Sequence, residues 1–261
     1  MPSDTRKWAA AVDVDRLTLK YAQRIFAPPC EIEIVELMVA PDRRVPAVAG
    51  DDLDRAESLE DARDRARRLV MVVSALLFTR DPTRPRVYPK EVYERLKDGS
   101  WREHPLRVAP RGGHTRSRIF NRSYSEKSID TEPSERKWLA VLDGKNVIDA
   151  LHALSGEPDW FDLWKAHEAV KGYQKGLHNK AKWPKGHDPV MERFEKSATL
   201  HRHSPANEHY RCAKKYFKTQ GLTPMSLREA AEAVARSVRD WLEGERAALI
   251  RRQSRKGRDR G

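Results

Sequence analysis

The chain has 261 residues, of which 39% are hydrophobic and 34% are charged, and its formal net charge is +12. This length can bury a substantial core in one large domain or two small ones. The longest apolar run, Leu69–Phe78, is far shorter than the roughly 20 residues of a membrane helix, so we expect no membrane partner. There is no signal-peptide pattern, and two cysteines are too few for a disulfide framework, which together predict a cytoplasmic protein.

The positive charge is concentrated in the last third of the chain. Residues 1–170 carry 29 basic and 29 acidic side chains, whereas residues 171–218 carry 12 basic and 4 acidic ones, and residues 219–261 carry 10 and 6. Segregated positive charge is typical of a polyanion partner, because neutralising phosphates releases counterions. The alternative is a basic face that is only solvated. The charge distribution favours a nucleic acid.

The N-terminal half predicts a strand, a loop and a helix in that order. Isoleucines alternate with glutamates over Cys30–Val39, as in a half-buried strand. The acidic segment 41–57, which contains proline and glycine, predicts a loop. Ser58 begins a capping-box-like start with an aspartate in the third place, and Leu59–Thr79 has apolar residues at helical spacing. We expect the C-terminal half of this helix to be buried.

The next segment, 86–108, predicts a hairpin. Asp98-Gly99 lies between two runs of mixed polarity, and this dipeptide is a strong hairpin signal. A short amphipathic helix after Pro89 is the alternative. Residues 109–136 contain a Gly-Gly pair and many serines and arginines, which is typical of a linker.

From residue 138 onward the pattern is helical. The first expected helix is Asn146–Leu154. The second, Pro158–Val170, has on one face Trp160, Leu163, Trp164, His167 and Val170. A third helix starts at Asp188-Pro189 and has as its apolar side Val190, Met191 and Phe194, and a last helix runs from Leu227 to Leu242 after the capping box Ser226–Glu229. We place the end of that helix at Gly244 and expect a disordered basic tail after it.

These elements predict an α+β protein with two domains. Residues 1–136 form a small mixed domain with its linker, residues 137–243 form an all-α helical bundle, and residues 244–261 form the basic disordered tail. No sequence signal gives the order of the strands.

The densest cluster of reactive side chains is the segment 201–211, HRHSPANEHYR. Arg202 and His209 have six residues between them, including a proline, and could converge on one phosphate. Arginine holds a phosphate bidentately, and histidine transfers protons near neutral pH, so the pair suits phosphodiester chemistry. The alternative is a polar loop that is merely exposed. The HxH pair of His201 and His203 lacks accompanying carboxylates or cysteines, so we predict neither a metal nor another cofactor.

Further residues predict nucleic-acid contacts around that pair. Trp183 lies in a lysine-rich run and is a candidate for stacking on a base, whereas His167, on an apolar face, is better explained as a core residue. The candidate nucleic-acid-binding residues are His203, Arg211, Lys214, Lys215, Lys182, Trp183 and Lys185.

The C-terminal third resembles the HEPN superfamily, in particular uncharacterised bacterial proteins with a small N-terminal α+β domain and a HEPN-like helical domain. The matching pieces are Trp160–Trp164, Arg193-Phe194, Pro224–Leu227 and Trp241-Leu242, within roughly residues 145–243. The superfamily's signature is an arginine followed after four to six residues by a histidine, and Arg202 and His209 meet that spacing.

The resemblance implies a metal-independent endoribonuclease, in a phage-defence or toxin setting, that works as a homodimer. His209 would exchange protons with the ribose 2′-OH, and Arg202 would hold the phosphate. The relatives carry Arg-His directly before the lysine-rich stretch, where this chain has Tyr210-Arg211-Cys212. If Arg211 is the family arginine, the domain is a degenerate one that binds RNA or another partner without cleaving it. A metal-dependent nuclease is a third hypothesis.

Overall fold

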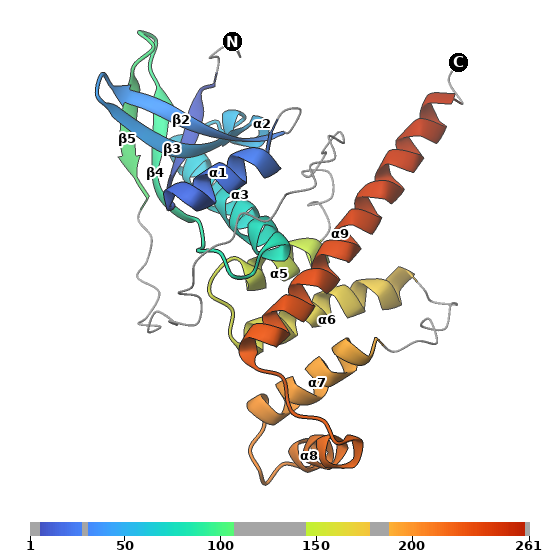
Figure 1. Cartoon of the computed structure of the whole chain (residues 1–261). Coiled ribbons are helices and arrows are strands. Elements are labelled where there is room, and N and C mark those ends of the chain that lie inside the picture. The colour runs from blue at the N-terminus through green and yellow to red at the C-terminus, as the bar shows by residue number, and fades with distance from the viewer. Residues whose placement is uncertain (1–5, 28–30, 107–144, 178–187, 259–261) are drawn as a thin grey trace. The chain divides into compact units, whose positions relative to one another are not determined.

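The computed structural model describes residues 6–27, 31–106, 145–177 and 188–258. The chain divides into two compact units. The first comprises Met1–Leu77 and Thr83–Ala140, and the second comprises Phe78–Pro82 and Val141–Gly261. The domain boundary expected at residue 136 therefore falls among residues outside the described ranges. Both sheet and helix are present, so the protein is of the α+β class (Figure 1).

The first unit is built on a five-stranded antiparallel sheet in the order β2-β3-β1-β4-β5. The strands are β1 (Trp8–Asp13), β2 (Ile32–Ala40), β3 (Arg43–Gly50), β4 (Tyr88–Arg95) and β5 (Trp101–Pro105). The helices are α1 (Arg16–Ile25), α2 (Asp51–Asp54) and α3 (Leu59–Arg80), whose last residues group with the second unit.

Both sides of the central strand β1 are buried. One side contributes to an apolar cluster of Ala9, Ala11, Leu37, Val45, Ala47 and Tyr93, while Trp8, Ala10 and Val12 on the other side are at most 4% exposed. The Tyr93 hydroxyl donates to Glu103 on β5 (2.9 Å) and accepts from Arg43 at the start of β3 (3.5 Å). These bonds therefore link β4 to β5 and to β3 next to the apolar cluster.

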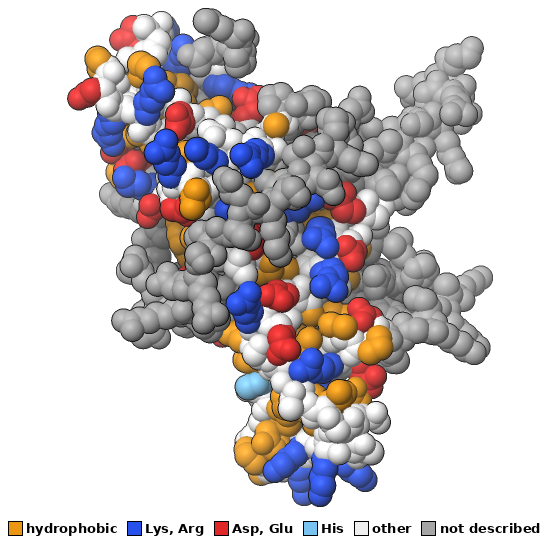
Figure 2. Space-filling view, viewed as in Figure 1, with side chains coloured by type: hydrophobic (Ala, Val, Ile, Leu, Met, Phe, Trp, Pro, Cys, Tyr) orange, Lys and Arg blue, Asp and Glu red, His pale blue; other side chains and the backbone are white. Residues whose placement is uncertain are grey.

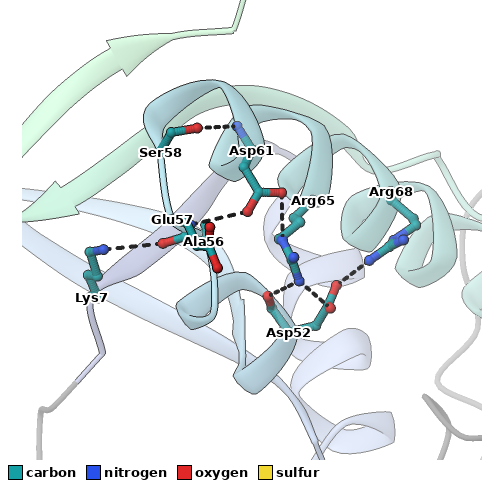
Figure 3. Close-up of polar contacts among 8 residues, drawn as sticks. All are labelled: Lys7, Asp52, Ala56, Glu57, Ser58, Asp61, Arg65 and Arg68. Atoms are coloured by element: carbon teal, nitrogen blue, oxygen red, sulfur yellow. Dashed lines mark hydrogen bonds and ion pairs between the residues drawn. The ribbon is translucent and has the colours of Figure 1, made fainter.

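A polar network fixes the corner between α2 and α3 (Figure 3). Asp52 accepts hydrogen bonds from Arg65 (2.8 Å) and Arg68 (2.7 Å), and Asp61 accepts one from Arg65 (2.8 Å). The bond from Arg65 lowers the pKa of Asp61 below its ordinary value. Ser58 accepts from the Asp61 backbone N–H (3.2 Å), so the predicted capping residue does cap α3.

The hairpin predicted around Asp98-Gly99 is confirmed, since β4 and β5 pair across that turn and Gly99 has φ = 84°. The alternative of a helix after Pro89 is wrong. The expected loop at 41–57 is also wrong, because β3 and α2 occupy most of it. Val45 and Ala47–Ala49 supply the apolar content of β3, and Pro46 lies just beyond the two pairs that join β3 to β1.

The second unit is helical. It contains α5 (Lys145–Leu154), α6 (Trp160–Leu177), α7 (Pro189–Arg202), α8 (Glu208–Gln220) and α9 (Leu227–Arg258). Helix α6 packs against α5, α7 and α9. The core of the second unit includes five side chains that are each at most 1% exposed: Leu151, Leu163, Phe194, Val234 and Leu242. The three predicted helices before residue 203 and the capping box at Ser226–Glu229 are present.

Three features of the second unit differ from the sequence expectations. Helix α8 occupies a segment for which no helix was predicted. The last helix continues through Gly244 to Arg258, because one glycine without a following proline does not end a helix. Val190, expected on the apolar side of α7, is 40% exposed. Among the described helices, none combines the length and the apolar composition that crossing a membrane would require.

Candidate nucleic-acid interface

The candidate site lies where α7 ends and α8 begins. Asp188 caps α7 by accepting from the Val190 N–H (2.9 Å), and α7 runs to Arg202. Asn207 caps α8 by accepting from the His209 N–H (2.8 Å). Only residues 203–207 lie between the two helices, and the Asn207 N–H donates to the Ser204 carbonyl (2.9 Å) across that turn. The predicted cluster 201–211 is therefore two helix ends joined by a tight connection.

The two predicted catalytic residues face different neighbours. His209, in the first turn of α8, is exposed and its ring lies 5.7 Å from that of His203. The Arg202 guanidinium carbon lies 4.5 Å from the centre of the Trp164 ring on α6 and 5.6 Å from that of Phe161. These are cation–π contacts. Within the described residues, Arg202 forms no ion pair with a carboxylate.

Helix α8 carries a stripe of four cations, which we call the α8 basic stripe: Arg211, Lys214, Lys215 and Lys218. All four side chains are exposed. Their spacing of i, i+3, i+4 and i+7 puts them on one face of the helix, and Figure 2 shows Lys and Arg side chains gathered over α8. Ala213 and Phe217, on the opposite face, are buried. No ion pair found among the described residues involves any of the four cations.

Lys218 belongs to this stripe, although it was not among the nucleic-acid-binding residues predicted from the sequence. The signal was available in the sequence, because Ala213 and Phe217 are four residues apart and mark the buried face of a helix. Asn207 as an N-cap and Gly221, with φ = 62° at the C-terminal end, mark its limits. Reading α8 as a helix would have aligned Lys218 with Arg211.

An aromatic cluster next to Arg202 joins α6 to α7. Phe194 is fully buried between Trp160, Trp164 and His167, with ring centres 5.4–6.4 Å away. His167 is 6% exposed, as expected of a core histidine. Its Nε2 lies 2.9 Å from Glu195 Oε1, which also accepts from Lys171 (2.7 Å).

Glu195 is the most perturbed carboxyl group near the site. The hydrogen bond from His167, together with that from Lys171, lowers its pKa to about 2 despite partial burial. The group is thus a fixed negative charge that holds α6 and α7 together. We interpret this network as structural, because it joins two residues of α6 to one residue of α7.

The remaining predicted residues fall elsewhere. Lys182, Trp183 and Lys185 lie outside the described residues.

No group of three or more histidine, cysteine or acidic side chains that could hold a metal ion occurs in the part of the chain that the structure describes.

No protein-family model, no curated protein and no solved structure matches this chain.

Proposed function

We propose that the second unit binds nucleic acid, RNA by preference, through the α8 basic stripe. The observation that carries the proposal is the exposure of four cations on one helical face that no described carboxylate neutralises. Ordinary surface helices pair such residues with acidic ones one turn away. Arg228 and Glu232 on α9 do so at 3.0 Å. A phosphate backbone supplies the charge that α8 lacks.

The stripe predicts how strongly binding depends on salt. Its four residues span seven positions, about 10 Å along the helix axis. If each neutralises one phosphate of a single strand, the slope of log affinity against log salt is about −2.8, which weakens binding about 50-fold between 50 and 200 mM salt. A partner recognised by apolar contacts would show little of this dependence.

The test measures RNA affinity against salt concentration by fluorescence anisotropy. Replacing Arg211 and Lys215 by glutamine should make the slope shallower by about 1.4, because two phosphate contacts are lost. The matched control replaces Lys20 and Arg24, an exposed lysine and arginine with the same i, i+4 spacing on α1 of the first unit. If both double variants change the slope equally, or the native slope is near zero, the proposal is wrong.

A second candidate function is the metal-independent cleavage of RNA expected for a HEPN-type protein. The supporting observation is the pair of histidine rings, His203 and His209, which lie 5.7 Å apart at the helix junction; His203 directly follows Arg202 in the chain. Two imidazoles can serve as the base that takes the 2′-OH proton and the acid that protonates the leaving oxygen. A guanidinium over an aromatic ring can still present N–H groups to a phosphate. A homodimer, as the family resemblance implies, belongs to this proposal.

Cleavage is tested with labelled RNA and a DNA of the same sequence in the presence of a chelator. We expect only the RNA to be cut, since DNA has no 2′-OH, and His209→Ala should abolish the activity. His152→Ala, at an exposed histidine on α5, is the control. Binding without cleavage would leave a non-catalytic RNA-binding protein. Activity that chelator removes would indicate a metal-dependent nuclease instead.

A further inference from the structure

The junction of α6 and α7 presents a series of nearly parallel rings that ends in solvent. The Trp160 ring lies 4.3 Å from the His201 ring with 11° between their planes, and 6.4 Å from the Phe194 ring with 17° between them. Phe194 is fully buried, Trp160 is intermediate and His201 is exposed. We call these three residues the ring series. Its outermost member is a flat ring with accessible surface.

Two cations lie over aromatic rings of α6 whose residues neighbour the ring series in the chain. Arg202 follows His201 directly in the chain and lies over Trp164. The ammonium group of Lys165 lies 4.4 Å from the centre of the Phe161 ring, which is 50% exposed. Aromatic surface bordered by cations is the arrangement that binds single-stranded nucleic acids, because the rings stack on bases and the cations contact the backbone.

The charge state of His201 suits stacking better than phosphate binding. Partial burial lowers the pKa of its imidazole below the ordinary value, and no described carboxylate pairs with it. The ring is therefore mainly neutral at pH 7. A neutral ring that already lies flat on Trp160 offers a base a π-face rather than a charge.

We propose that His201 is a stacking platform for an unpaired base, so that the nucleic acid bound by the second unit is single-stranded RNA. This inference rests on the proposed function, because the α8 basic stripe supplies the phosphate contacts. His201 and the stripe lie at the two sides of the same short connection, residues 203–207. A base in a duplex cannot reach such a platform, since both of its faces are covered by its neighbours.

The experiment uses an unstructured 12-nucleotide RNA with a central 2-aminopurine, whose fluorescence falls when the base stacks, and the duplex of the same sequence. We expect the native protein to quench the probe and to prefer the single strand. His201→Ala should weaken single-strand binding by about 5- to 140-fold. Duplex affinity and the salt slope should stay unchanged, because the phosphate contacts remain.

His201→Phe should retain both the affinity and the quenching, since it keeps an aromatic ring. His152→Ala is the control for loss of an exposed histidine. If His201→Ala does not fold, as judged by circular dichroism, His201→Gln removes the ring with a smaller change in polarity. The single-strand affinity should fall in the same way.

Two results would overturn the inference and leave the proposed function intact. One is unchanged quenching and affinity in His201→Ala. The other is an equal loss of single-strand and duplex binding in that variant, while the double variant at Arg211 and Lys215 still alters the salt slope. If the native protein binds neither RNA at any salt concentration, the proposed function itself is wrong, and the inference falls with it.

Discussion

Replacing Glu195 by glutamine removes the charge on which His167 and Lys171 converge. A carboxyl pKa of about 2 instead of the ordinary 4.5 corresponds to about 3 kcal/mol of stabilisation at neutral pH before solvent screening. The side chain is 27% exposed, so we reduce this to about 1–2 kcal/mol. We expect the glutamine variant to be less stable than the native protein by that amount at pH 7.

The same substitution should have a defined pH dependence. A carboxyl group with a lowered pKa in the folded state stabilises the fold above its unfolded pKa and loses that effect as the pH falls toward its folded pKa. The stability difference between native and variant protein should therefore be constant from pH 7 to about pH 5.5. By pH 3 it should have fallen to less than about half of its value at pH 7.

Urea unfolding at pH 7, 5 and 3, followed by tryptophan fluorescence and circular dichroism, measures this difference. The control is Glu168→Gln, which removes a charge from an exposed position on α6 with no partner among the described ion pairs. We expect it to have no measurable effect. A Glu195→Gln penalty that is the same at pH 7 and pH 3 would show that the carboxylate charge does not stabilise the fold.

Three further substitutions test the packing of the fold by the same urea assay. Gly50→Ala should cost about 1–3 kcal/mol, because its Cβ would lie 2.7 Å from the backbone oxygen of Glu31; an unchanged midpoint would mean that β2 shifts freely. Ser226→Ala should cost about 1 kcal/mol through loss of the capping box of α9, and no loss would mean that the cap contributes nothing. Tyr93→Phe should cost about 1 kcal/mol, since it removes the hydroxyl that bonds Glu103 on β5 and Arg43 on β3. A neutral result there would show that these hydrogen bonds do not stabilise the sheet.

Elements with strong local signals could be predicted from the sequence. Asp98-Gly99 specifies a tight turn, Asp188-Pro189 a helix start, and Ser226–Glu229 a capping box. In each case, the residues that carry the signal make the hydrogen bonds or adopt the backbone conformation in question. Local chemistry therefore sufficed at these three places, whereas the local signals of α8, Asn207 at its start and Gly221 at its end, were not recognised.

Elements that depend on distant partners were missed. The alanines of β1, Ala9–Ala11, show no alternation because both sides of the strand are buried. The sequence of segment 43–50 predicts a loop, and it forms a strand because it pairs with β2 on one side and β1 on the other. The site shows the same limit: the spacing of Arg202 and His209 is visible in the sequence, but the aromatic rings beneath Arg202 come from another helix.

The α8 basic stripe also affects how the second unit holds together. Like charges one turn apart repel each other, and the described part of α8 buries only Ala213 and Phe217 to offset this. We therefore expect α8 to open at a lower free energy than α6 or α7, and its amides to exchange hydrogen first. A bound phosphate backbone would neutralise the stripe and slow that exchange. Helix α8 would then be the least stable helix of the three in the free protein and the one that ligand binding stabilises most.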